Sequence, residues 1–564
     1  MKKFFQYLII FFLSLFFVRE LSVVFEKSIT CDEIVHIPAG YFYVKKGDFF
    51  INYAHPPLCK TISGIFLSFL DIRFPEDIYQ KYRFTEWDWG LGILFFLFNK
   101  DKVEYISFLS RLPMIFLGIL LGFYIYLWAT DLYGKIAGIF SLFLFTFCPN
   151  FLAYSCLVIT DTAVSLFFLM TLYYLWKFYE LNNKKYLIFS GISFGLALST
   201  KFSAFFILSI IVLIFFFYGI IKGRFRKEIF CFFIISFLII PFLILFVFYN
   251  FNFLNLKWFI EGIRRIFKET VQTGQELYLN GKFSNTGFRS FFLWVFLYKT
   301  PIPFIIILVL SIVLKPKIEK KEIFLILPAI LYFLISSFSK KQVGGVRYIL
   351  PFYSFLYIFV GRIFAYHSKL KLILLSPLIL CYSFESFKIH PHYLAYFNQI
   401  AGGPENGWKK LLNIDWGQDL TGLKSFLDKE KNTEIMINHF GVIPPEVYNI
   451  YNYEPFLYQA FMSVPEEKYH INSEKPKKEY LVISVNPLCG LHYSDHNIFW
   501  YLKETKPKTK IGYSIFIYDI TDNIYLREKI AETLEKYGYK KQAERQRKVI
   551  EYIKKKEIEN EKKY

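Results

Sequence analysis

The chain has no CxxC pair and no Cys/His spacing of the kind that holds zinc, and its seven cysteines are an odd number. These absences argue against a structural zinc site and against a disulfide framework. Cys31 and Cys59 fall in one loop and could pair, but two free thiols are the favoured interpretation. No small-x-small cleavage site follows the apolar run at residues 4–25. We therefore interpret this run as an uncleaved membrane span rather than a signal peptide.

Acidic residues are fewer than basic ones, with 46 Asp and Glu against 66 Lys and Arg, a net charge of +20. Of the 564 residues, 55% are hydrophobic and 21% are aromatic. A water-soluble domain cannot bury so much apolar surface, which indicates a polytopic membrane protein whose partner is the lipid bilayer. Membrane topology accounts for the basic excess, so no nucleic-acid partner is expected.

Eleven membrane spans are predicted, because about 20 apolar residues are needed to cross a hydrocarbon core of about 30 Å. They lie at residues 4–25, 105–128, 134–150, 160–179, 185–199, 202–221, 229–249, 291–314, 322–338, 347–366 and 369–387. With a cytoplasmic N-terminus, the inner loops carry the basic clusters at residues 2–3, 135, 184–185, 222–227, 315–321 and 369–371. This distribution follows the positive-inside rule of a cytoplasmic membrane.

The predicted fold class is therefore an all-α polytopic membrane protein, residues 1–387, followed by a small extracytoplasmic α/β domain, residues 388–520. Three segments of this domain are predicted strands, EIMINHF, YLVISV and IGYSIFIYDI, and QDLTGLKSFLDKE is a predicted helix. Residues 521–564 form a charged tail that is predicted to be a helical hairpin broken at Gly538. In the first outer loop, residues 26–104, two short apolar runs are expected to be helices at the membrane surface.

The first outer loop gathers ionisable residues just beyond the first span, namely Asp32, Glu33, His36, Asp48 and His55. Such groups are costly beside a membrane unless they have a function. An ordinary solvated loop with scattered charges is the alternative. Other outer segments bring further charged residues to the same side of the membrane, which favours a functional site.

The further candidates are Asp161, Lys201, Lys299, Arg347 and His390. Asp161 is interpreted either as a carboxylate favoured by a helix start or as part of a site. Each cation alone is best explained by a side chain reaching for the interface, but three on one face suit a phosphate whose lipid tail stays in the bilayer. The planar fork of Arg347 can grip phosphate at two points. A carboxylate that takes a proton from a hydroxyl, beside cations that stabilise a leaving phosphate, suits transfer from a lipid phosphate.

Several motifs, taken in this order, resemble those of one family. They are Asp32-Glu33, HPPL at 55–58, Thr160-Asp161, KTP at 299–301, GGVRYILP at 344–351, HPHYLAYFNQIAGGPENGW at 390–408 and DWGQDL at 415–420. The chain resembles membrane glycosyltransferases of the protein O-mannosyltransferase group, whose wider GT-C fold includes bacterial aminoarabinose transferase. The resemblance implies an enzyme at the outer face of the cytoplasmic membrane. It would transfer a sugar from a polyprenyl-phosphate donor to a hydroxyl acceptor, with inversion, as a hexosyltransferase for which mannose is one candidate sugar.

The resemblance also implies residue roles. Asp32 is the expected general base, and Glu33 and Asp161 support it. Arg347, with Lys201 and Lys299, is expected to bind the lipid phosphate, and His55 and His390 are expected substrate contacts. Some members of the fold bind a divalent metal ion, for which Asp32, His55 and Asp161 could supply ligands.

Two departures leave the acceptor open between Ser or Thr of an exported protein and a surface glycan or lipid. Residues 250–290 are too few for the luminal β-trefoil domain of eukaryotic members, and His55 stands where the aminoarabinose enzyme has an acidic residue. A transporter or flippase of lipid-linked sugar is one rival interpretation, and a non-catalytic binder is another. A transporter predicts internal repeats and charges near the bilayer middle. The sequence shows no repeat, and its charges gather at one face.

Overall fold

The computed structural model describes residues 2–85, 87–221, 227–272, 276–314, 317–339, 342–365, 369–430, 432–457 and 476–561. The chain forms two compact units. The membrane unit comprises Met1–Phe25 and Asp32–Asn413, and the C-terminal unit comprises Glu26–Cys31 and Ile414–Tyr564. Residues 388–413 thus pack with the membrane unit, although the sequence analysis assigns them to the second domain. The reason is that Asn398 and Asn413 are hydrogen-bonded to residues of the 297–300 segment.

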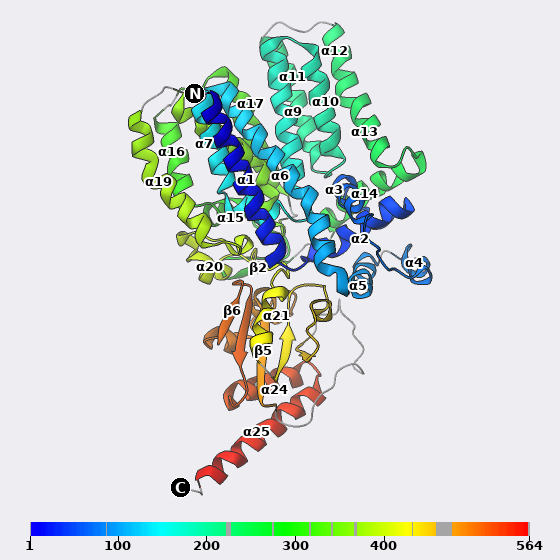
Figure 1. Cartoon of the computed structure of the whole chain (residues 1–564), viewed down its shortest axis with the longest axis vertical. Coiled ribbons are helices and arrows are strands. Elements are labelled where there is room, and N and C mark those ends of the chain that lie inside the picture. Colours follow the sequence, from blue (N-terminus) through cyan, green and yellow to red (C-terminus); the bar gives the residue numbers. More distant parts are fainter. Residues whose placement is uncertain are drawn as a thin grey trace. The chain divides into compact units, whose positions relative to one another are not determined.

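The membrane unit is almost entirely helical (Figure 1). Its helices are α1 (Lys2–Glu26), α2 (Cys31–Lys46), α3 (Leu58–Leu67), α4 (Glu76–Tyr82), α5 (Asp88–Phe98), α6 (Val103–Tyr133), α7 (Lys135–Thr146), α8 (Pro149–Tyr154), α9 (Asp161–Leu181), α10 (Lys184–Leu198), α11 (Ala204–Ile221), α12 (Lys227–Ile234), α13 (Ile240–Phe248), α14 (Phe253–Gln272), α15 (Phe291–Lys299), α16 (Ile302–Val313), α17 (Ile323–Phe338), α18 (Leu350–Val360), α19 (Lys369–Lys388) and α20 (Gly403–Asn406). A small hairpin pairs β1 (Leu277–Leu279) with β2 (Lys282–Ser284).

Local chemistry explains where the long helices begin and end. Helix α6 has 31 residues, about 46 Å, and stops at Gly134, whose φ of +96° only glycine adopts easily. Helix α9 begins with the carboxylate of Asp161 and ends at Asn182 in the left-handed conformation. The side chain of Asn183 then caps α10 by accepting a hydrogen bond from the Lys185 amide.

Five described helical segments are long and apolar enough to cross a membrane, namely Lys3–Glu26, Lys100–Tyr133, Glu228–Phe248, Lys320–Phe338 and Gly345–Phe364. Helices α15 and α16 together could form a sixth span. It is bent by 107° at the two-residue break, Thr300 and Pro301, between the helices. The helical membrane fold is therefore confirmed, whereas the count of eleven spans stays a prediction. Residues 222–226 and 315–316 of the predicted inner loops lie outside the described residues.

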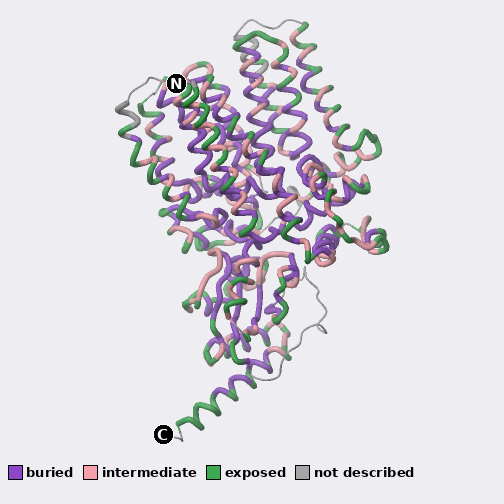
Figure 2. The backbone as a smooth tube through the Cα atoms, in the orientation of Figure 1, coloured by how far each residue is buried: buried purple, intermediate pink, exposed green. Residues whose placement is uncertain are grey.

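Burial separates inner from peripheral helices within the membrane unit (Figure 2). Helix α9 is buried along most of its length and packs against α6, α10 and α18. Helices α1 and α13 instead expose large apolar side chains such as Phe4, Ile10, Phe242 and Leu243. Apolar side chains at the periphery of a helix bundle suit contact with lipid.

The two apolar runs of the first outer loop form α3 and α5, so the predicted helices are confirmed. Helices α2 and α3 approach closely where Gly40 and Gly64 meet. A Cβ added to either glycine would come within 2.1 Å of backbone atoms of the other helix. All seven cysteines are free thiols, so Cys31 and Cys59 do not pair.

The C-terminal unit is built around a five-stranded mixed sheet in the order β4-β3-β5-β7-β6. The strands are β3 (Thr433–Asn438), β4 (Tyr453–Pro455), β5 (Lys478–Ser484), β6 (Thr509–Ile511) and β7 (Ile515–Asp519). Strands β3, β4 and β5 run parallel, and β7 is antiparallel to both β5 and β6. The helices are α21 (Leu420–Lys429), α22 (Val485–Cys489), α23 (Trp500–Glu504), α24 (Ile524–Lys536) and α25 (Lys540–Glu561). The predicted strands, the helix before them and the tail hairpin broken at Gly538 are therefore confirmed.

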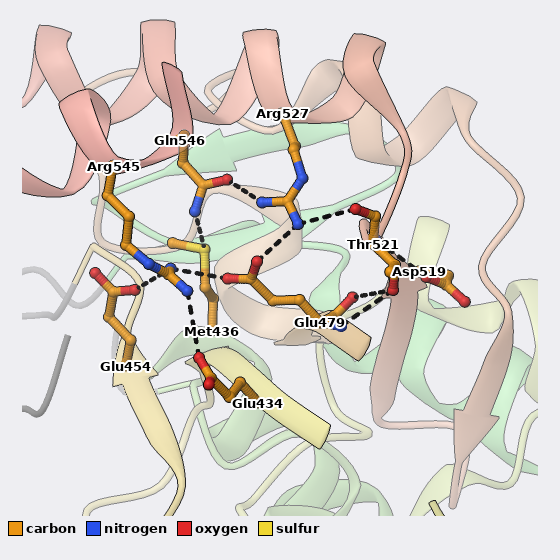
Figure 3. A network of polar contacts seen from close by, with 9 residues as sticks. All are labelled: Glu434, Met436, Glu454, Glu479, Asp519, Thr521, Arg527, Arg545 and Gln546. Atoms are coloured by element: carbon orange, nitrogen blue, oxygen red, sulfur yellow. Dashed lines mark hydrogen bonds and ion pairs between the residues drawn. The ribbon is translucent and has the colours of Figure 1, made fainter. Parts of the chain in front are cut away.

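A buried polar network attaches the tail hairpin to the sheet (Figure 3). Arg527 of α24 and Arg545 of α25 both donate to Glu479 of β5, at 2.7 and 2.8 Å. Arg545 also donates to Glu454 of β4 at 2.7 Å. The hairpin therefore belongs to this unit rather than forming a separate solvated tail.

Candidate functional site

The central contact of the membrane unit is an ion pair between Asp32 and Arg347. Asp32 lies in the first turn of α2, and Arg347 lies in the single-turn helix Gly345–Ile349 that leads into α18. The guanidinium Nη1 donates to Oδ2 of Asp32, and the Asp32 side chain remains 25% exposed. Burial acts to raise the pKa of Asp32, but the charge and hydrogen bond of Arg347, together with the nearby His36 and Lys201, outweigh it, so the net pKa is lowered. Asp32 is therefore an accessible carboxylate that stays ionised near neutral pH.

A second ion pair adjoins the first. Asp161, at the start of α9, accepts a 2.6 Å hydrogen bond from Nζ of Lys201. The ammonium of Lys201 also lies 4.6 Å from the ring centroid of Tyr348, and the guanidinium of Arg347 lies 5.6 Å from the same centroid. Tyr348 thus lies near two cations, each of which is paired with a carboxylate. We call Asp32, Arg347, Asp161 and Lys201 the paired-charge cluster.

His36 lies one helical turn after Asp32, on the same face of α2. Its Nδ1 is 2.7 Å from the carbonyl oxygen of Val158, which can only accept, so this nitrogen carries the proton. Burial lowers the pKa of His36 to about 4, and its ring is therefore neutral at pH 7. The ring of His55 meets it edge to face at 5.3 Å, which places His55 beside this helix face.

Glu33 faces a different partner from its neighbour Asp32. Its carboxylate is fully buried and accepts two hydrogen bonds from Arg111 of α6, at 2.8 and 2.6 Å. Oε1 also accepts from the Val158 amide at 3.0 Å. Glu33 therefore joins α2 to α6 and to the segment that precedes Asp161, rather than pointing into the paired-charge cluster.

Lys299 and His390 also make contacts outside this cluster. Lys299 is 1% exposed, and its amine donates to the carbonyl oxygens of Leu394 and Asn413. His390 lies within 3.1 Å of the Ser22 hydroxyl and within 2.7 Å of the Tyr393 hydroxyl. These residues bind the post-membrane segment to α15 and α1.

Of the eight site residues predicted from the sequence, the structure therefore brings four together, namely Asp32, Asp161, Lys201 and Arg347. His55 contacts His36, which lies one turn after Asp32 on α2. Sequence reasoning assigned no role to His36, Tyr348 or Arg111. Their signals were available, because His36 follows Asp32 by four positions, Tyr348 follows Arg347, and Arg111 is a charge inside an apolar span.

The described residues include no group of three or more His, Cys, Asp or Glu side chains arranged to hold a metal ion. Asp32, His55 and Asp161 are thus not assembled as a ligand set. Each of the two carboxylates faces a cationic side chain instead.

Comparison with known proteins gives a family match and likenesses to solved structures. Residues 88–248 match the family model described as dolichyl-phosphate-mannose-protein mannosyltransferase. No curated protein matches the chain. Two solved structures of ArnT from Cupriavidus metallidurans, one in the apo state and one bound to undecaprenyl phosphate, share 10% identity with this chain at a TM-score of 0.47. Each comparison covers 90% of this chain and 97% of the other.

The matched region runs from α5 to the end of α13 and contains Asp161 and Lys201, two members of the paired-charge cluster. It is independent of the first-loop and post-membrane motifs, because Asp32, Arg347 and residues 390–408 lie outside it. Over residues 88–248 the chain is thus similar to the mannosyltransferase family that its motifs also resemble.

Proposed function

We propose that the protein transfers a sugar from a polyprenyl-phosphate donor to a hydroxyl acceptor at the outer face of the cytoplasmic membrane. The observation that carries this proposal is the paired-charge cluster, in which two carboxylates and two cations meet around Tyr348. Glycosyl transfer from a phosphate needs both kinds of group, a base for the acceptor and cations for the leaving phosphate. The family match supports the class of enzyme.

The donor phosphate would bind Arg347 and Lys201. A guanidinium binds phosphate through two parallel hydrogen bonds, and an ammonium adds a second positive charge. The same two side chains are ion-paired with Asp32 and Asp161 in the structure. Phosphate therefore competes with the carboxylates for the cations. Donor binding releases Asp32 from Arg347, so that the base becomes available once a donor is in place.

Asp32 would then accept the proton of the acceptor hydroxyl as the hydroxyl oxygen attacks C1 of the sugar. The bond between C1 and the phosphate oxygen breaks, and polyprenyl phosphate leaves with the electron pair. The two cations stabilise the charge that develops on it. Attack opposite the leaving group inverts the anomeric carbon through an oxocarbenium-like transition state. Asp161 supports this step by holding Lys201, and His55, beside His36, would contact the acceptor.

The predicted roles of three other residues change in this proposal. Glu33 supports the site through its ion pair with Arg111 instead of orienting the acceptor. Lys299 and His390 are anchors of the post-membrane segment instead of substrate contacts. Each role changes because the side chain is engaged by other parts of the protein and is not directed at the substrate.

The experiment is sugar transfer by purified protein in lipid, with radiolabelled polyprenyl-phosphate mannose and a membrane-protein extract as acceptor. Asp32→Asn should lower transfer by about a hundredfold or more, the scale expected for loss of a general base. Asp71→Asn is the matched control, because the Asp71 side chain in the same outer loop is 90% exposed and pairs only at the surface with Lys102.

Equal transfer by wild type and Asp32→Asn would remove Asp32 as the base. If wild type transfers nothing, the donor or acceptor class is wrong. Sugar-lipid that copurifies with such an inactive protein, or that crosses vesicle membranes in its presence, would instead favour a binder or a flippase.

A further inference from the structure

Lys299, at the end of α15, is a buried lysine whose amine has no carboxylate partner among the described residues. Its amine donates to the carbonyl oxygens of Leu394 at 3.0 Å and Asn413 at 2.9 Å. The ammonium also lies 3.8 Å from the ring centroid of Phe397. Burying an ammonium is expensive, so its contacts must be well satisfied. Two carbonyls and one aromatic face engage its donors and leave it poorly placed to bind a substrate phosphate.

The backbone that Lys299 holds carries the Asn413 side chain to the turn that precedes Arg347. Oδ1 of Asn413 accepts from the Val346 amide at 3.3 Å, and its Nδ2 lies 3.4 Å from the carbonyl oxygen of Gly344. The hydroxyl of Tyr154 approaches Oδ1 at 3.5 Å. These contacts are individually long, but together they engage both ends of the Asn413 amide.

Gly345 packs directly on this amide. Its φ is +58°, and a Cβ at this position would come within 2.4 Å of Cγ of Asn413. Only glycine combines this backbone conformation with so close an approach. The turn therefore fits Asn413 closely, and Arg347 begins two residues later. A displacement of Asn413 would be transmitted over one or two peptide bonds to the guanidinium.

We propose that Lys299 and Asn413 are positioning residues that together hold the turn of residues 344–346, so that Arg347 meets the phosphate of the lipid donor. This rests on the proposed function, because it assigns that phosphate to Arg347. It also gives a physical role to Lys299 of the KTP motif and to Asn413, two residues before DWGQDL. Lys299 holds the backbone of Asn413, and the Asn413 side chain holds the backbone of the turn, so neither residue touches the substrate.

Asn398 offers a matched control. Its Nδ2 donates to the carbonyl oxygens of Leu297 and Thr300, at 2.5 and 2.7 Å, and its Oδ1 accepts from the Ala401 amide. Asn398 thus ties the same post-membrane segment to the same end of α15. Among the described residues, all the hydrogen-bond partners of its side chain lie in these two segments and none lies in the turn at 344–346. Loss of either Asn should loosen the segment, but only loss of Asn413 should disturb Arg347.

The test measures binding of undecaprenyl phosphate, a lipid phosphate without sugar, to the full-length protein in detergent. Arg347→Gln and Asn413→Ala should each raise Kd by about tenfold, since a misplaced binding group loses much of its effect. The double variant should bind no more weakly than Arg347→Gln, because both changes remove the same interaction. Lys299→Met should behave like Asn413→Ala. Asn398→Ala should lower the melting temperature but leave Kd unchanged.

The outcomes separate the two proposals. If Arg347→Gln binds normally, the assignment of phosphate to Arg347 fails and the proposed function with it. If Arg347→Gln binds weakly but Asn413→Ala binds normally, only the positioning role is wrong. If Asn413→Ala and Asn398→Ala weaken binding equally, and each adds to Arg347→Gln, the effect is general loosening and the positioning role is again wrong. Where Asn413→Ala does not fold, Asn413→Ser provides the same comparison.

Discussion

At the scale of single residues, Asp32 and Glu33 show how two adjacent carboxylates acquire different chemistry. Successive residues of a helix point about 100° apart, so the two side chains of α2 face different surroundings. Asp32 is partly exposed and meets Arg347, whereas Glu33 is fully buried and meets Arg111. Acid–base chemistry requires access to substrate, and only Asp32 has that access.

The buried pair leads to a prediction about stability. Glu33→Gln would leave the Arg111 guanidinium buried without its counter-charge, which should lower the free energy of unfolding by about 3–5 kcal/mol. Thermal unfolding of the purified protein in detergent measures this loss. Glu33→Leu combined with Arg111→Met should recover much of the stability, because no uncompensated charge remains. Unchanged stability together with lost transfer would show that Glu33 acts on substrate after all.

The Asp32–Arg347 pair leads to a prediction about pH. Because the pKa of Asp32 is lowered from 3.8, the carboxylate of the free enzyme stays ionised above about pH 4. The acid limb that Asp32 contributes to kcat/KM should therefore lie below pH 4, and kcat/KM should not fall between pH 8 and pH 5 from its protonation. Arg347→Gln removes the lowering charge and should move this limb to higher pH. An acid limb near pH 6 that Arg347→Gln leaves in place would indicate another base.

At the scale of elements, the C-terminal unit depends on how α24 and α25 attach to the sheet. Glu479 lies on β5, a strand with neighbours on both sides, and it accepts hydrogen bonds from an arginine of each helix (Figure 3). Glu454 and Glu434, from β4 and β3, complete the surroundings of Arg545. Amphipathic periodicity predicts two helices here, but it contains no information about this buried attachment.

Removing Arg545 should destabilise this unit. Arg545→Ala leaves the buried carboxylates of Glu479 and Glu454 without one cation, and the expected cost is about 3–5 kcal/mol. The control is Arg547→Ala, two residues along α25, because the pair of Arg547 with Glu535 is about half exposed. An exposed pair contributes less than about 1 kcal/mol. Limited proteolysis of the full-length protein, in which the rate of cleavage within α24 and α25 is followed, measures the stability loss of both variants. Equal protease resistance of the two variants would mean that the network contributes little.

At the scale of the whole molecule, the arrangement in the membrane follows from composition and charge. The described helices include five that are long and apolar enough to span, and the basic clusters lie in the loops predicted to be cytoplasmic. The proposed reaction requires the paired-charge cluster to lie on the outer side. The outer location of residues 388 onward is a separate prediction from the loop charges.

Cysteine labelling tests this orientation. Lys548→Cys, on α25, should react with a membrane-impermeant maleimide added to intact cells, because the C-terminal unit is predicted to be outside. Lys184→Cys, at the first residue of α10, should react only after permeabilisation. The exposed native thiols Cys231 and Cys381 are first replaced by Ser to remove background. Labelling in the opposite pattern would invert the predicted topology and move the site to the cytoplasmic face.

Features that depend on short stretches of chain could be read from the sequence alone. The apolar runs determined a helical membrane protein, apolar segments determined three of the five strands of the C-terminal sheet, β3, β5 and β7, and Gly538 determined the break in its tail hairpin. These features follow from the local length and period of apolar residues, so a window of sequence contains them. The composition likewise excluded a water-soluble fold.

Only the tertiary structure decided which charged residues meet. Asp32 and Arg347 are 315 positions apart, and local spacing says nothing about a contact between them. The same holds for Glu33 with Arg111, which the sequence analysis placed beside the base, and for Lys299, which it placed on the phosphate. Helix packing determines which charged side chains meet. It buries Glu33 against Arg111 and leaves Asp32 partly exposed beside Arg347. Residue type therefore supplied the candidates for the site, and packing selected among them.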